Sequence, residues 1–213
     1  KNSGIAEYNT KTGIQTDHRK NRLLSRSLPM GASTFLLDKG TLWIGSDESG
    51  LYEVDISDKN LPRVIQHHTY SKTNPYSFSS GSVSCLIKHS GVLFVGTNGD
   101  GLFLYKEGSF TRLSGSDGMP SNNIVSLSIS SDTTMWVLTN GGLALVDWKN
   151  KNINIVSRQE GLDGFFKDRD ALIPKGDGDV YVVSPSGLQL VNIDQLYINE
   201  YEASVVVESV QLI

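Results

Sequence analysis

Histidines are the residues of this chain best suited to acid–base catalysis or metal binding, and their spacing favours neither. The four are His18, His67, His68 and His89, and no two of them have the separation typical of a zinc site. His67 and His68 are adjacent, so on a strand they would point to opposite faces. We expect a surface or loop role for this pair, with no metal and no cofactor.

The single cysteine, Cys85, could act as a nucleophile or a redox thiol, or simply fill space as a small buried residue. No histidine or basic cluster that would activate the thiol is adjacent, which favours packing. One cysteine forms no internal disulfide, so cysteine usage leaves the compartment open.

Two acidic turns, Asn98-Gly99-Asp100 and Asp177-Gly178-Asp179, begin like calcium loops but lack the rest of the twelve-residue ligand pattern. Turn formation explains them better. The sequence also has no phosphate-binding glycine loop and no nucleophile elbow. We therefore expect a non-catalytic chain.

Two segments combine aromatic and polar residues in a way suited to ligand binding. The first is the long stretch 67–82, and the second, 158–170, packs two phenylalanines among several charges. Aromatic faces stack on sugar rings, and polar side chains add directional hydrogen bonds. The alternative is that these segments only close one repeat onto the next. The candidate ligand-binding residues are His68, Tyr70, Tyr76, Arg158, Phe165, Phe166 and Arg169.

A sequence motif repeated along the chain must position these segments. It consists of an aromatic-centred strand, a polar turn, and then Gly-Leu with a second alternating strand. The glycines of that second strand are residues 4, 50, 101, 142 and 187, so the repeat lengths are 46, 51, 41 and 45 residues. Such a period with strand-type patterning is typical of a β-propeller blade.

Each full repeat divides into four strands. In the third copy these are 123–129, 135–139, 142–147 and 152–157. The large rings at equivalent points suit the gap between neighbouring sheets: Trp43, Phe94, Trp136 and Tyr181. We predict an all-β fold, a β-propeller of four-stranded blades with about four full blades and a partial one. The propeller would span residues 1–198.

Composition limits the remaining classes. The 213 residues are 38% hydrophobic with a net charge of −4, which is typical of a globular chain with a substantial core. Lysine and arginine form no cluster, which argues against nucleic-acid binding. Because the first repeat lacks its aromatic strand, we expect a piece of a longer polypeptide. The open sheet edges would favour self-association.

Several stretches of the sequence resemble the two-component regulator propeller repeat. Thr41-Leu42-Trp43-Ile44-Gly45 with Gly50-Leu51 resembles its Leu-Trp-Ile-Gly-Thr and Gly-Leu. Asn74-Pro75-Tyr76-Ser77-Phe78-Ser79-Ser80 is similar to its Asn-Pro-x-Ser-Leu-Ser-Ser linker, and Asp117-Gly118-Met119-Pro120-Ser121-Asn122 to its Glu-Gly-Leu-Pro-Ser-Asn. The segment 205–212 resembles the first strand of the sandwich that follows such propellers, so the resemblance implies that 199–213 is the first strand of a β-sandwich. The resemblance covers residues 4 to about 196, and it implies part of a larger, seven-bladed propeller.

What the resemblance implies is the periplasmic sensor region of an inner-membrane histidine kinase, often a hybrid with its own response regulator. The ligand would be an oligosaccharide or another small molecule, the partner a second copy in a dimer, and the membrane helix would lie downstream. Two alternatives stay open. One is a propeller lyase acting on sugar or cyclic substrates, and the other is a non-catalytic interaction scaffold. The output domain could also be a signalling domain other than a kinase.

Overall fold

The computed structural model describes residues 6–17, 28–29, 31–58, 62–156, 171–184 and 187–195. These residues form strands almost throughout, joined by turns and by two short 3₁₀ helices, η2 (Gly115–Asp117) and η4 (Ile193–Gln195). Within the described ranges no helix has the length and apolar character needed to cross a membrane. The prediction of an all-β fold is confirmed.

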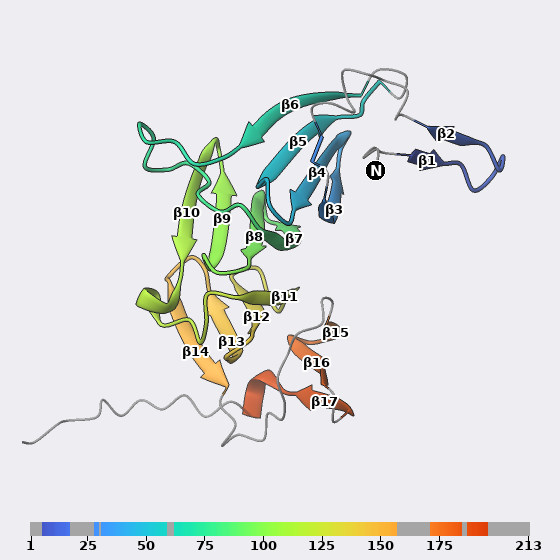
Figure 1. Cartoon of the computed structure of the whole chain (residues 1–213). Coiled ribbons are helices and arrows are strands. Elements are labelled where there is room, and N and C mark those ends of the chain that lie inside the picture. The colour runs from blue at the N-terminus through green and yellow to red at the C-terminus, as the bar shows by residue number, and fades with distance from the viewer. Residues whose placement is uncertain are drawn as a thin grey trace, which may run out of the picture.

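The strands form consecutive antiparallel sheets in which each strand pairs with its neighbour in sequence. This order arises because tight turns join the strands of each repeat. Figure 1 shows the sheets following one another in chain order. A two-stranded sheet comes first: β1 (Ala6–Tyr8) and β2 (Gln15–Asp17). The first four-stranded sheet contains β3 (Ala32–Asp38), β4 (Thr41–Ser46), β5 (Leu51–Asp55) and β6 (Arg63–His68). The second contains β7 (Val83–His89), β8 (Val92–Thr97), β9 (Leu102–Lys106) and β10 (Ser109–Leu113).

The third repeat tests the strand prediction most directly, because all of its residues up to Val156 are described. Its strands are β11 (Ile124–Ile129), β12 (Thr134–Thr139), β13 (Gly142–Asp147) and β14 (Asn152–Val156). Each observed boundary lies within one residue of the predicted one. The fourth repeat contributes β15 (Leu172–Gly176), β16 (Asp179–Ser184) and β17 (Gly187–Val191). The predicted sandwich strand, 199–213, lies outside the described residues.

The first strands of successive sheets contact one another: β3 with β7, β7 with β11, and β11 with β15. The sheets therefore pack face to face in sequence, as neighbouring blades do. Three of the predicted rings fill the gaps between them, since Trp43, Phe94 and Trp136 are each at most 4% exposed. Tyr181, in the fourth copy, is only half-buried.

Candidate ligand-binding site between two sheets

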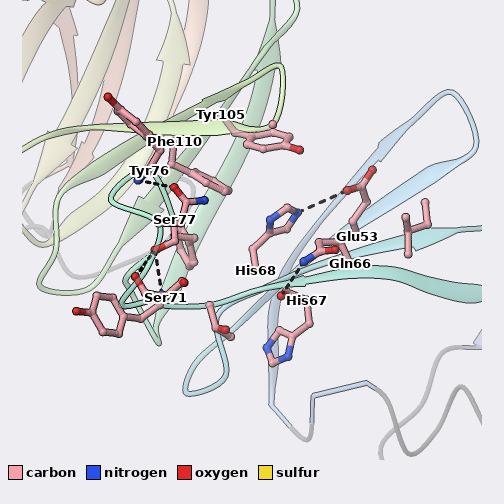
Figure 2. A pocket seen from close by; sticks show the side chains of 15 residues that line it. Glu53, Gln66, His67, His68, Ser71, Tyr76, Ser77, Tyr105 and Phe110 are labelled. Atoms are coloured by element: carbon pink, nitrogen blue, oxygen red, sulfur yellow. Dashed lines mark hydrogen bonds and ion pairs between the residues drawn. The ribbon is translucent and has the colours of Figure 1, made fainter.

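A cavity of about 490 Å³ lies between the outer strands of the first two four-stranded sheets. Its walls come from β5 and β6 on one side and from β9, β10 and the turn between them on the other, with the connecting segment 69–82 closing it (Figure 2). Three residues proposed from sequence, His68, Tyr70 and Tyr76, all line this cavity. The fold thus brings together the three predicted candidates that lie within the described residues.

Hydrogen bonds within the connecting segment hold it against the second sheet. The Asn74 side-chain oxygen accepts from the Tyr76 N–H at 3.0 Å, and the Ser71 N–H donates to the Ser77 hydroxyl at 3.0 Å. The Tyr76 carbonyl accepts from the N–H of Phe110 on β10 at 3.0 Å. Phe78, 1% exposed, anchors the segment in the core between the two sheets. The exposed Tyr70 and Tyr76 rings are therefore carried on a well-connected loop.

The adjacent histidines point to opposite faces of β6, as predicted from the alternation of a strand. His67 stacks on Tyr52 with ring centroids 4.0 Å apart, and its Nε2 lies 2.6 Å from the Ser49 carbonyl oxygen. His68 stacks on Trp43 at 5.8 Å. The prediction that His68 belongs to a loop is wrong, because His68 is the last residue of β6 and pairs with Leu51.

Aromatic rings surround His68 on the side of the second sheet. Its ring contacts Tyr105 edge-on at 5.2 Å and Phe110 edge-on at 5.3 Å. Tyr105 and Phe110 pack against each other at 4.6 Å. Edge-to-face pairs at such separations are favourable beyond the area they bury. The cluster therefore bridges the two sheets with rings from both.

One carboxylate, that of Glu53 on β5, faces this cluster. Its Oε2 lies 3.5 Å from His68 Nε2, which is too long for a good hydrogen bond, and that buried nitrogen has no hydrogen-bond partner among the described residues. The Nε1 of Trp43 is likewise buried without a partner among them. In the third repeat, by contrast, Trp136 Nε1 donates to the Gly178 carbonyl at 2.6 Å.

Burial, with the neighbouring His67, lowers the pKa of His68 to about 4. Burial also raises the pKa of Glu53, an effect that Lys88 partly offsets. Burial, followed by the charge of Glu53, raises the pKa of Tyr105. At neutral pH the site therefore holds a neutral imidazole, a neutral phenol and a carboxylate.

We expect His68 to make the folding stability depend on pH. A folded pKa of about 4, below the usual 6.5, means that the unfolded chain binds the proton more readily. Its contribution is complete above pH 6.5 and is lost as the pH falls toward 4. After discounting for solvent screening the loss is on the order of 2 kcal/mol. Glu53, whose pKa is raised, acts in the opposite direction.

Urea unfolding at several pH values measures this effect, with His68→Asn as the comparison. The stability of the His68→Asn variant should fall less steeply between pH 6.5 and 4 than that of the wild type. Equal slopes for the two proteins would show that the imidazole is not held neutral by the fold.

The other reactive or metal-binding side chains contact neighbours that give them a role in the fold. Cys85 is half-buried against the core between the second and third sheets. His89 faces the exposed Asp132 at 3.4 Å. The Asp179 carboxylate accepts from Lys175 Nζ at 2.9 Å, Asn192 Nδ2 at 2.9 Å and the Ile193 N–H at 3.0 Å, so it organises a turn.

Across the described ranges, no group of three or more His, Cys, Asp or Glu is arranged to hold a metal ion. The candidates Arg158, Phe165, Phe166 and Arg169, together with His18, lie outside the described residues.

Comparison with known proteins identifies a relative in sequence and solved structures of similar fold. Histidine kinase P4 of Formosa agariphila is 25% identical over 208 residues, which cover 96% of this chain and 15% of that protein. The extracellular domain assigned to a hybrid two-component system of B. thetaiotaomicron superposes with a TM-score of 0.71 at 16% identity, covering 91% of this chain and 26% of that one. The chain resembles the extracellular domains of two-component sensors. A second such domain from the same organism gives a TM-score of 0.60 at 19% identity, covering 91% of this chain and 24% of that one.

The resemblance to two-component sensors proposed from the repeats is thus confirmed. No protein-family model matches the chain. The chain spans about one seventh of the curated relative and about a quarter of each of these extracellular domains.

Sequence reasoning missed Glu53, Tyr105 and Phe110, although the repeats themselves carry a signal for two of them. Counted from the repeat glycine, Glu53 and Tyr105 occupy positions that hold leucine and valine in the other three full copies, whereas the partial first copy has Glu7 and Tyr8 there. By strand pairing, His68 is equivalent to two buried apolar residues. The leucines at the position of Glu53 are Leu104, Leu145 and Leu190, and the valines at the position of Tyr105 are Val54, Val146 and Val191. The two residues equivalent to His68 are Leu113 and Val156.

Proposed function

We propose that this chain is part of the extracellular sensing region of a membrane-bound two-component histidine kinase and that it binds ligand without catalysing a reaction. The sheets would be blades of a larger, seven-bladed propeller on the periplasmic side of the inner membrane. The observation that carries the proposal is the cavity between two sheets of a fold shared with sensor extracellular domains. The kinase and phosphorelay chemistry would reside in other domains.

The cavity has the size and lining of a small-molecule site. Its volume of about 490 Å³ falls in the range typical of ligand pockets. Tyr70 and Tyr76 offer exposed rings, while Gln66, Ser71 and Asn74 supply hydrogen-bonding groups. Rings beside polar side chains suit a hydroxylated ring such as that of an oligosaccharide.

Signalling would follow from the way two sheets share the cavity. A ligand in contact with both walls favours the relative arrangement of the sheets that it fits best, and only its differential affinity for the arrangements shifts their populations. A dimer of the receptor would pass this shift through the membrane helix to the kinase.

The proposal predicts that Tyr76→Ala weakens binding of an oligosaccharide ligand about tenfold, because a stacked aromatic contributes roughly 1–1.5 kcal/mol. A thermal-shift screen of polysaccharide-derived oligosaccharides would identify a ligand, and calorimetry would measure its affinity for each variant. Tyr8→Ala is the matched control, since Tyr8 is similarly exposed (63% against 58%) but lies on β1, outside the cavity lining. If Tyr76→Ala bound as tightly as the control, the cavity would not be the site.

A further inference from the structure

Three residues meet at one place where the third repeat has apolar residues: Glu53, His68 and Tyr105 are equivalent to Leu145, Val156 and Val146. Glu53 and His68 come from the first four-stranded sheet, Tyr105 comes from the second, and all three line the cavity. Glu53 Oε2 is 3.5 Å from His68 Nε2, and the His68 ring is 5.2 Å from that of Tyr105. Replacing apolar residues with polar ones at an inter-sheet contact weakens packing, so such a local conflict is expected where a site is built.

The charge of the cavity has one sign. Among the described residues, Glu53 is the only acidic residue in its lining, and no lysine or arginine lines it. The nearby Lys88 is paired with Asp38. The lining histidine closest to Glu53, His68, is neutral at physiological pH because its pKa is about 4. A ligand entering the cavity therefore meets one negative charge.

The Glu53 carboxylate also lacks a strong partner on the cavity wall. It is 22% exposed there, and its contact is the long one with a neutral imidazole. Lys88 offsets the cost of burying this carboxylate only in part, and a ligand cation would offset more of it. The rings of Tyr105 and Phe110, 4.6 Å apart, stand on the facing wall. Aromatic faces attract cations as well as sugar rings.

We propose that the cavity binds a ligand carrying a protonated amine, with the ammonium group against the Glu53 carboxylate and the rest of the ligand along the rings of Tyr105 and Phe110, which the His68 imidazole separates from Glu53. This inference rests on the proposed function, since it takes the cavity to be the ligand site. It narrows the ligand class to amines such as amino sugars, and it excludes acidic sugars, whose carboxylate or sulfate groups would face Glu53 in a cavity that no described lysine or arginine lines.

Three β-linked disaccharides of similar shape test the charge preference: those of glucosamine, glucose and glucuronic acid. Calorimetry with the 213-residue chain at neutral pH and low salt should show the glucosamine disaccharide binding at least tenfold more tightly than the glucose one, with the glucuronic acid disaccharide weakest. Glu53→Gln, which keeps the shape and removes the charge, should abolish this preference. The preference should also shrink as salt is added.

Asp177→Asn is the matched control, because it removes one negative charge from an exposed turn between β15 and β16 and asparagine tolerates the φ of 54° there. Retention of the amine preference in Glu53→Gln would overturn the proposal, as would binding of the neutral or acidic disaccharide as tightly as the amine. Failure of the glucosamine disaccharide to bind at millimolar concentration would overturn it too. If other oligosaccharides bound in that case and Tyr76→Ala weakened them, the proposed sensing function would stand without the amine preference.

Discussion

Replacing Trp136 with alanine is expected to lower the free energy of unfolding by about 4 kcal/mol, because a large ring and a hydrogen-bond donor are lost together. Trp136 on β12 is fully buried in the core shared by the third and fourth sheets. Its indole N–H also donates to the Gly178 carbonyl in the β15–β16 turn at 2.6 Å. Truncation would leave a large cavity and remove one of two donors to the Gly178 carbonyl, the other being the Ser130 hydroxyl at 2.9 Å. Urea unfolding followed by circular dichroism measures the loss.

Trp136→Phe separates the two contributions. Phenylalanine keeps most of the buried ring but offers no donor to Gly178, so a loss of about 1–2 kcal/mol is expected. A loss below about 1 kcal/mol for alanine itself would show that the two sheets do not depend on this ring for their contact.

Gly101→Ala is expected to cost at least about 3 kcal/mol. Gly101 precedes β9 with a φ of +88°, and an added Cβ would lie 2.3 Å from the backbone carbonyl oxygen of Leu113. A backbone atom cannot move aside as a flexible side chain can, so the hairpin between β9 and β10 must shift. The Thr97 hydroxyl, which donates to the Gly101 carbonyl at 2.7 Å, would be disturbed as well. Thermal and urea unfolding would both report the change.

The control is Gly91→Ala in the turn between β7 and β8. Gly91 has a similar φ of +78°, but no atom lies within 4 Å of its added Cβ. The backbone conformation alone should then cost about 1 kcal/mol. Equal losses at Gly91 and Gly101 would mean that the close approach of Leu113 carries no penalty.

The strands were predictable because each pairs with its neighbour in sequence. Alternation along 142–147 and the turn glycines set the register locally, without information from distant residues. The outer strand β6 was harder to bound, since Ile65 is 52% exposed and Gln66 and His67 are also exposed. Its polar end therefore looked like the start of a loop, and His68 was misplaced for that reason.

The candidate site was predictable only in part. Tyr70 and Tyr76 stood out because aromatic residues are unusual in an otherwise polar connecting segment. Glu53, Tyr105 and Phe110 did not, because each lies on a strand, and only a comparison of the full repeats position by position distinguishes Glu53 and Tyr105. That these side chains meet depends on how one sheet packs on the next, which the pattern within a repeat does not specify.

Because the cavity lies between two adjacent repeats, its position affects how receptors of this kind could acquire new ligand specificities. Glu53 and His68 belong to one repeat, and Tyr105 and Phe110 to the next. A repeat exchanged or duplicated as a unit would carry only half of this site, and it would alter the junctions on both of its sides. New specificities should therefore arise through paired changes in adjacent repeats, and the recombination of single repeats should erase existing ones.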